Sequence, residues 1–201
     1  MKEITTKSGR KIEVYDDLFS YGLITQLYYD LRSMEFPLVT QNDTSVLDYS
    51  GVFGFGKNLP LDLMLAFIEK SDRHSELSLF LSEYSPIRSW VNVYNGQHST
   101  NRYHTDDYCQ GYTVKGQLMS MLYYANPKWD LEWDGGTVFR SDDLEDVEYL
   151  SDYKPGRIVL FDSSIPHKIY QTSSLAHPYR FTVNTIFKNN NLVQFHNISI
   201  S

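Results

Sequence analysis

The chain has 201 residues, a length that suits one domain built around one substantial hydrophobic core. Its formal net charge of −7 argues against nucleic acid as the main partner, because phosphate binding needs a concentrated basic face. The single cysteine, Cys109, excludes an internal disulfide and favours a reducing compartment, so we expect a cytoplasmic protein. No stretch is apolar for long enough to cross a bilayer, and we expect no membrane segment.

Two segments in the first half of the chain, residues 20–34 and 59–71, carry helical periodicity. The apolar residues that recur at this spacing are Leu23, Leu27 and Leu31 in the first segment and Leu63 and Phe67 in the second. Both segments are predicted to be amphipathic helices. Between them, the Gly-rich residues 45–58 lack the spacing of a P-loop, and we interpret them as a flexible loop and a candidate lid.

The chain changes character near residue 88, beyond which short β-rich runs are separated by Gly, Asn, Asp and Pro. The predicted strands are residues 88–95, 117–126, 136–141, 157–163 and 180–188. This pattern indicates an antiparallel sandwich or barrel supported by the helices, in the α+β class with a mainly β core. The acidic residues 141–156 are expected to form an exposed connection, and the tail 189–201 is either an edge strand or a loose end.

The short sequence "YHTDDY" places His104 and Asp106 two positions apart, which is weak evidence by itself. A second histidine, His167, follows the strong strand pattern of "GRIVLFDSSIPHKIYQ" and a short polar turn. Two histidines and one carboxylate make the facial triad that suits non-haem Fe(II), because they leave adjacent coordination positions open. Zinc is the competing metal for the same ligands.

A possible anion site lies on the strand "RFTVNTIF", where Arg180 and Thr182 are two positions apart and share a face. An inward arginine is costly unless it meets an anion, and its guanidinium fits a carboxylate. A structural salt bridge is the alternative. Tyr94 and Tyr124 also lie on polar strand faces, although each alone is more commonly a core residue.

Four segments, in order, now carry a resemblance: "NVY" ahead of "HTD", then "LYYANPKWDLEWDGGTVF", "PGRIVLFDSSIPHKI" and "RFTVN". From about Tyr94 to Phe187 the chain resembles the catalytic core of iron(II)- and 2-oxoglutarate-dependent oxygenases, most closely the prolyl 4-hydroxylase-like group. The resemblance implies a double-stranded β-helix, or jelly roll, with N-terminal supporting helices. We therefore expect a single oxygenase domain over residues 1–201, with residues 1–87 as a helical support region and residues 88–188 as the catalytic core.

The resemblance also implies the roles of the site residues. His104, Asp106 and His167 would hold Fe(II), Arg180 would pair with the distal carboxylate of 2-oxoglutarate, and Tyr94, Tyr124 and Thr182 would line the same pocket. Dioxygen would be the second co-substrate, succinate and CO2 would be released, and ascorbate stays open as an accessory reductant. The "WDGG" turn resembles the family's turn before the next barrel strand, where glycines permit an unusual backbone path.

The chain departs from the closest prolyl hydroxylases in the interval between His167 and Arg180, which is longer and contains His177. His177 and His98 are therefore rival ligands, although neither has the strand context of His167. Cys109 is interpreted as a packed thiol rather than a ligand.

The leading prediction is a hydroxylase that acts on a substrate C–H bond, with a prolyl or other peptidyl residue as the first guess. A cupin-like metal-binding protein without oxidation chemistry is an alternative, and Arg180 argues against it because such a protein needs no carboxylate clamp. An oxygenase acting on a nucleobase or a small metabolite would use the same core residues. The loops expected at the entrance, residues 96–103, 126–134 and 45–58, carry no specificity code, and the oligomeric state stays open.

Overall fold

The computed structural model describes residues 1–34, 54–94, 102–107, 117–176 and 179–191. The helices are α1 (Tyr21–Arg32), α2 (Leu61–Glu69) and α3 (Ser75–Glu83), with a short 3-10 turn, η2, at Leu131–Trp133. The strands are β1 (Lys2–Thr5), β2 (Lys11–Tyr15), β3 (Gly54–Asn58), β4 (Tyr84–Tyr94), β5 (Leu118–Tyr124), β6 (Thr137–Arg140), β7 (Val147–Ser151), β8 (Ile158–Asp162), β9 (His167–Ile169) and β10 (Arg180–Asn189).

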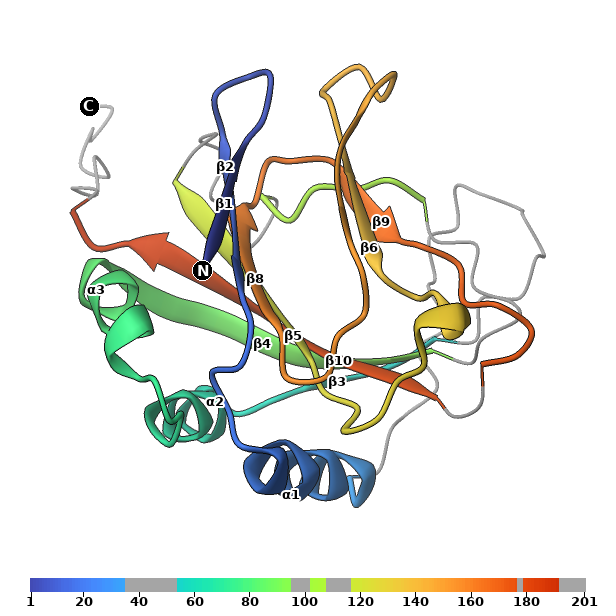
Figure 1. Cartoon of the computed structure of the whole chain (residues 1–201). Helices are drawn as coiled ribbons and strands as arrows, with labels where there is room; N and C mark the ends of the chain where they lie inside the picture. The colour runs from blue at the N-terminus through green and yellow to red at the C-terminus, as the bar shows by residue number, and fades with distance from the viewer. Residues whose placement is uncertain (35–53, 95–101, 108–116, 177–178, 192–201) are drawn as a thin grey trace, which may run out of the picture.

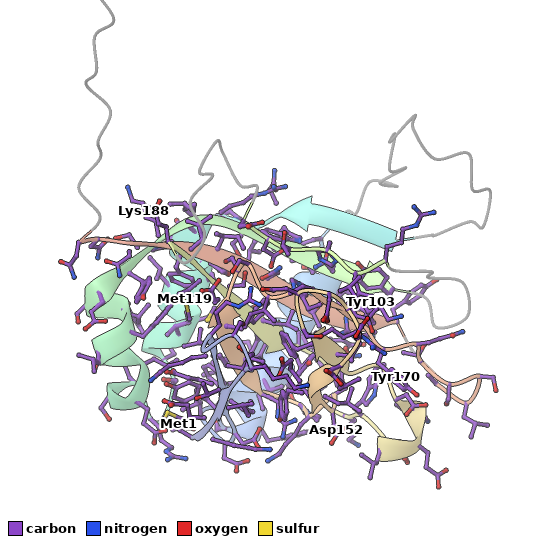
Figure 2. All side chains as sticks on the ribbon, turned by 90° about the horizontal axis from the view of Figure 1, so that it is seen from above. Met1, Tyr103, Met119, Asp152, Tyr170 and Lys188 are labelled. Carbon is purple, nitrogen blue, oxygen red and sulfur yellow. The ribbon has the colours of Figure 1, made fainter. Side chains whose placement is uncertain are left out.

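These strands form two antiparallel sheets. The large sheet has the order β1-β2-β8-β5-β10-β4-β3, and the small sheet has the order β7-β6-β9. The three helices cover one side of the large sheet, and the small sheet lies on its other side (Figure 1). Seen from above, side chains fill the layer between the two sheets (Figure 2). The predicted α+β class with a mainly β core is confirmed.

The long strand β10 shows how the sequence sorts side chains onto the two sides of the large sheet. Successive residues of a strand point to opposite faces, so Phe181 and Val183 enter the cluster under the helices while Arg180 and Thr182 share the other face. All four are buried. A strand buried on both faces lies in the interior of the sheet, here between β5 and β4.

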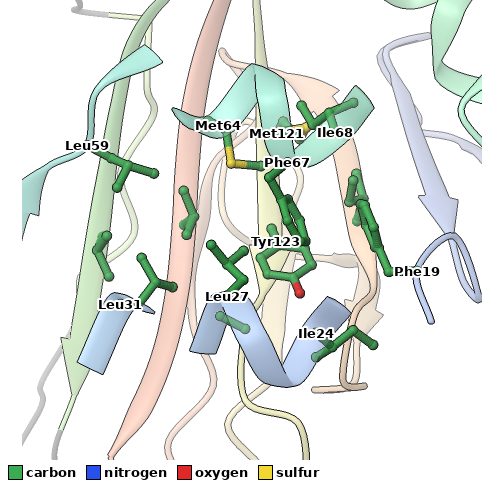
Figure 3. Packing of buried hydrophobic residues seen from close by; sticks show 14 of the residues in the cluster. Phe19, Ile24, Leu27, Leu31, Leu59, Met64, Phe67, Ile68, Met121 and Tyr123 are labelled. Carbon is green, nitrogen blue, oxygen red and sulfur yellow. The ribbon is translucent and has the colours of Figure 1, made fainter. Parts of the chain in front are cut away.

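The hydrophobic core under the helices is the larger of the buried clusters. The labelled members in Figure 3 come from α1, α2 and β5 and, for Phe19 and Leu59, from the residues just before the two helices, and they pack around Tyr123. Phe67 stacks on Phe19 with ring centroids 4.5 Å apart, and both rings contact Tyr123 edge-on. These aromatic contacts fasten the helices to the large sheet.

Both predicted helices are present, but the buried face of α2 is shifted from the predicted one. Leu63 is 37% exposed, and the helix instead buries Met64, Phe67 and Ile68. The sequence of α2 explains the difference. Nearly every residue of this helix is apolar, so periodicity could not show which side of the helix is buried. In α1, Leu27 and Leu31 are buried as predicted, and Leu23 is partly buried against the same cluster.

Several predicted loops contain strands. Residues 1–87 were expected to be a helical support region, yet β1 and β2 extend the large sheet through pairing of β2 with β8. The Gly-rich segment 45–58 ends in β3, which pairs with β4, and its first residues lie outside the described part of the chain. The acidic segment 141–156 is not wholly a connection, because it contains β7, which pairs with β6. Each of these strands has at most five residues, and a run that short shows too little alternation to be recognised from composition.

The tail beyond residue 191 lies outside the described residues. Among the described residues, no helix is both long and apolar enough to cross a membrane.

Candidate metal centre and carboxylate pocket

Three side chains from two distant segments of the chain meet at one edge of the small sheet. His104 forms an isolated antiparallel bridge with His167, the first residue of β9, through backbone hydrogen bonds of 3.1 and 3.0 Å. The backbone N–H of Asp106 donates to the Ser163 carbonyl at 2.8 Å. As a result, one ligand atom from each of His104, Asp106 and His167 lies within 4.8 Å of the others.

The two imidazoles are oriented by backbone carbonyls. His167 Nδ1 lies 3.0 Å from the Ile165 carbonyl, and His104 Nδ1 lies 3.1 Å from the Arg102 carbonyl. A carbonyl can only accept, so each Nδ1 carries the proton and each Nε2 is left with a lone pair for a metal. Burial lowers the pKa of His167, which favours the neutral imidazole that metals bind.

The carboxylate of Asp106 is held by two donors from the large sheet. Ser120 Oγ donates to Asp106 Oδ2 at 2.8 Å, and Asn184 Nδ2 donates to the same oxygen at 3.1 Å. Ser163 Oγ lies 2.8 Å from Ser120 Oγ and continues this network. Such hydrogen bonds fix the orientation of a metal-binding carboxylate. Sequence analysis missed Asn184 as a site residue, although it continues the strand face of Arg180 and Thr182.

The three candidate ligands differ in their access to solvent. The His104 side chain is 45% exposed, whereas those of Asp106 and His167 are each 7% exposed. His167 also packs against the buried ring of Phe161, with ring centroids 4.8 Å apart. The centre is therefore closed on the His167 side and open on the His104 side.

The second part of the site is the guanidinium of Arg180, which is 1% exposed. Its Nε donates to the Gly135 carbonyl at 2.6 Å, and its Nη1 donates to Thr182 Oγ1 at 3.3 Å. Its Nη2 has no hydrogen-bond partner within the part of the chain that the structure describes. Among the described residues Arg180 donates to a carbonyl and a hydroxyl and pairs with no carboxylate, so the structural salt bridge that was the alternative is absent there.

Aromatic rings surround this guanidinium. Its central carbon lies 6.0, 5.6 and 5.3 Å from the ring centroids of Tyr94, Tyr124 and Tyr153. The Tyr124 hydroxyl donates to Thr137 Oγ1 at 2.9 Å. Burial among these rings lowers the pKa of Arg180. Sequence analysis placed Tyr94, Tyr124 and Thr182 here, and it missed Tyr153 and Thr137, which come from the acidic segment and from β6.

The "WDGG" turn brings its backbone against Arg180. Gly135 has a φ of 76°, and a Cβ on it would lie 2.7 Å from Thr172 Cγ2. A Cβ on Gly136 would lie 2.3 Å from the Ser151 carbonyl oxygen. Both positions need glycine, as the sequence predicted. The close approach leaves the Gly135 carbonyl free to accept from Arg180.

The donor types suit the groups that the sequence implies. Two imidazole nitrogens and one carboxylate with open positions are the ligand set that Fe(II) oxygenases use. A buried arginine with an unpartnered Nη2 fits an incoming carboxylate, which could accept from that nitrogen. The rival ligands His98 and His177, and also Cys109, lie outside the described residues.

Comparisons with known proteins agree with this chemistry. Residues 89–188, about half of the chain, match the model of the 2OG-Fe(II) oxygenase superfamily. No similar sequence is found among curated proteins. Solved structures with a similar fold include a prolyl-4-hydroxylase from Pseudomonas putida (15% identity, 90% of this chain and 94% of that chain covered, TM-score 0.61).

Two further structures widen the range of similar proteins. One is a prolyl hydroxylase from Trichoplax adhaerens in complex with a hypoxia inducible factor peptide (16% identity, 89% of this chain and 83% of that chain, TM-score 0.61). The other is HygX from Streptomyces hygroscopicus with nickel and 2-oxoglutarate bound (9% identity, 93% of this chain and 84% of that chain, TM-score 0.64). At these identities the likeness is one of fold.

The chain belongs to the 2OG-Fe(II) oxygenase superfamily. It is an oxygenase that depends on Fe(II) and 2-oxoglutarate, as the sequence predicted, and its core is the predicted double-stranded β-helix. The resemblance to the prolyl 4-hydroxylase-like group is confirmed in the fold.

Proposed function

We propose that His104, Asp106 and His167 hold the Fe(II), and that Arg180 binds the distal carboxylate of 2-oxoglutarate. The observation that carries this proposal is the buried Nη2 of Arg180, for which the described residues offer no partner. A buried guanidinium donor without an acceptor costs free energy, and a bound carboxylate removes that cost. Thr182, Tyr94 and Tyr124 form the remaining wall of the carboxylate pocket.

The protein contributes orientation and shielding to the reaction. Bound Fe(II) supplies the activation of dioxygen, coupled to decarboxylation of 2-oxoglutarate to succinate and CO2 and to hydroxylation of a substrate C–H bond. The neutral imidazoles and the Asp106 carboxylate leave one positive charge on a divalent ion, which attracts an anionic co-substrate. Arg180 fixes the opposite end of that co-substrate, and the buried Asp106 and His167 keep water from one side.

For the substrate, we propose a peptidyl residue, with proline as the first candidate. The support is the fold shared with a prolyl-4-hydroxylase and with a prolyl hydroxylase that binds a peptide. The exposed side of His104 is where a substrate would approach the metal. HygX has also been solved with the small molecule hygromycin B, so a small-molecule substrate is the second candidate.

The extent of the domain and the location of the protein in the cell are proposed as well. We propose one oxygenase domain over residues 1–201 with residues 88–188 as its catalytic core, since the candidate ligands and Arg180 all lie in that range. We propose a cytoplasmic protein, on the support of its single cysteine.

The first experiment is an anaerobic titration of the Fe(II)-loaded protein with 2-oxoglutarate, followed by ultraviolet–visible spectroscopy. Chelation of iron by the keto acid end gives a weak metal-to-ligand charge-transfer band, and we expect that band in the wild type. Arg180→Ala should need a higher 2-oxoglutarate concentration to develop the band, with iron still bound. If the wild type binds iron stoichiometrically and develops no band, the protein binds metal without this chemistry and the assignment is wrong.

A substrate assay then separates the two substrate classes. Succinate formation that depends on added proline-containing peptides supports the peptidyl proposal. Succinate formation that is stimulated by small polar metabolites and by none of the peptides would instead favour the second candidate.

A further inference from the structure

At the start of β10, where Arg180 lies, the side chain of Asn126 forms the backbone hydrogen bonds that a neighbouring strand would otherwise form. The last regular hydrogen bond from the β5 side runs from the Ala125 N–H to the Phe181 carbonyl at 3.1 Å. The next residue, Asn126, then pairs through its amide. Asn126 Oδ1 accepts from the Phe181 N–H at 2.7 Å, and Asn126 Nδ2 donates to the Tyr179 carbonyl at 2.9 Å. The backbone is thus held by hydrogen bonds on both sides of Arg180.

A buried tyrosine, Tyr153, adds further hydrogen bonds to this arrangement. The Tyr153 hydroxyl lies 2.6 Å from both Asn126 Oδ1 and the Phe181 carbonyl, so its single proton serves two acceptors. The same oxygen accepts from the Asn126 N–H at 2.9 Å. Asn126 is 1% exposed and Tyr153 is 4% exposed. A buried network in which every polar group is hydrogen-bonded is rigid, because breaking one bond leaves buried polar groups with neither a protein partner nor water.

The same tyrosine also reaches the Arg180 side chain. Its ring centroid lies 5.3 Å from the guanidinium carbon, and the ring also stacks on Trp129 with centroids 4.2 Å apart. Trp129 Nε1 donates to the Asp134 carbonyl at 2.8 Å, and a Cβ on Gly135 would lie 3.1 Å from the Trp129 ring. Tyr153 therefore connects the backbone of Arg180 with the turn whose carbonyl accepts from its Nε.

We propose that Asn126 and Tyr153 are positioning residues that hold Arg180 ready for the distal carboxylate of 2-oxoglutarate. This inference rests on the proposed role of Arg180. An arginine side chain loses much rotational freedom when it binds a ligand, and a side chain that is already fixed avoids that cost. The Asn126–Tyr153 pair should therefore set the affinity for 2-oxoglutarate without contacting it.

A purely structural role for the pair would have a different signature. Loosening of the barrel as a whole would weaken every ligand of the metal centre and the metal itself. A defect confined to Arg180 would weaken 2-oxoglutarate and spare a chelator that does not reach Arg180. Oxalate is such a chelator, because it binds a metal through two carboxylates and has no distal chain.

The experiment compares two tyrosine variants of matched chemistry. Tyr153→Phe removes a hydroxyl with three hydrogen bonds. Tyr123→Phe removes a hydroxyl that has no hydrogen bond to any described residue, from a tyrosine that is also buried but lies on the helix side of the large sheet. The affinity of the metal-free protein for Mn(II) is measured first by isothermal titration calorimetry. The affinities of the Mn(II)-loaded protein for 2-oxoglutarate and oxalate are then measured by the same method. Asn126→Ala and Arg180→Ala are measured in parallel.

We expect Tyr153→Phe and Asn126→Ala to bind 2-oxoglutarate about tenfold more weakly than the wild type, the loss that one buried hydrogen bond represents. Their affinities for oxalate and Mn(II) should be unchanged, and Tyr123→Phe should match the wild type throughout. The inference is overturned if Tyr153→Phe binds 2-oxoglutarate like the wild type, or if it loses oxalate to the same degree. If Asn126→Ala does not fold, Tyr153→Phe alone decides.

Failure of the proposed function would look different. If Arg180→Ala binds 2-oxoglutarate as tightly as the wild type, Arg180 is not the carboxylate ligand, and both the proposed role and the inference fall. If Arg180→Ala loses affinity and Tyr153→Phe does not, only the inference falls.

Discussion

The two faces of the large sheet are both buried, but they hold their polar atoms differently. On the side of the small sheet, Ser120, Asn184 and Arg180 donate hydrogen bonds to specific acceptors around the candidate site. On the helix side, Tyr123 buries a hydroxyl without a partner among apolar side chains. Arg180 Nη2 is also unpartnered, but it belongs to a cation among oriented polar groups. A buried donor without a partner thus indicates a ligand site only where neighbouring polar groups are directed toward the same space.

Among the variants that test this comparison, Asp106→Ala should have the largest effect, and the affected quantity is metal affinity. Removing the carboxylate takes away one of three candidate ligands, and metal affinity should fall by more than about a hundredfold, beyond the range measured for outer-shell partners. The measurement is Mn(II) binding followed by electron paramagnetic resonance. Asp107→Ala is the matched control, because that neighbouring carboxylate accepts from Thr105 Oγ1 and is not one of the candidate ligands. Equal losses in both variants would contradict the assignment of Asp106.

The helix face should respond in the opposite way. Phe67→Ala removes a buried ring that stacks on Phe19 and contacts Tyr123, and the free energy of unfolding should drop by about 3–5 kcal/mol. Denaturant unfolding measures this loss. At a temperature where the variant is folded, its affinity for 2-oxoglutarate should equal that of the wild type. A selective loss of 2-oxoglutarate affinity would show that the two faces are coupled.

The outer partners of Asp106 should give a smaller effect. Ser120→Ala and Asn184→Ala each remove one donor to Asp106 Oδ2, and each should weaken Mn(II) binding by roughly tenfold. Thr185→Ala supplies the control, since its hydroxyl pairs in the same buried manner with Ser89 Oγ at 2.9 Å, away from the candidate ligands. If Thr185→Ala weakened Mn(II) binding as much, the effect would be one of sheet stability.

The sequence predicted much of the face that carries the chemistry. Arg180 and Thr182 could be assigned to one face because residues two apart on a strand point the same way. The glycines of the "WDGG" turn were also visible in the sequence: Gly135 has a left-handed backbone, and Gly136 lies too close to the Ser151 carbonyl for a side chain. These features are local, and local rules suffice for them.

The supporting contacts could not be predicted in the same way. Asp106 receives its bonds from Ser120 and Asn184, which are 14 and 78 positions away. Tyr153 comes from a segment whose acidic composition indicated an exposed connection, yet it is buried beside Arg180. Only the pairing of distant strands brings these groups together, and no periodicity in the sequence records that pairing.

The smallest expected effect is that of Tyr123→Phe on stability. The Tyr123 hydroxyl is buried with no hydrogen-bond partner, and burial raises the pKa of the phenol well above its usual value because the apolar core disfavours the charged form. The wild type already bears the desolvation cost of that hydroxyl, about 1–3 kcal/mol for a typical buried polar group. Removing it should leave the unfolding free energy unchanged or raise it by up to about 1 kcal/mol, as measured by denaturant unfolding. A clear destabilisation would mean that the hydroxyl has a partner, such as a buried water, and that the helix face does not differ from the other face in the way described above.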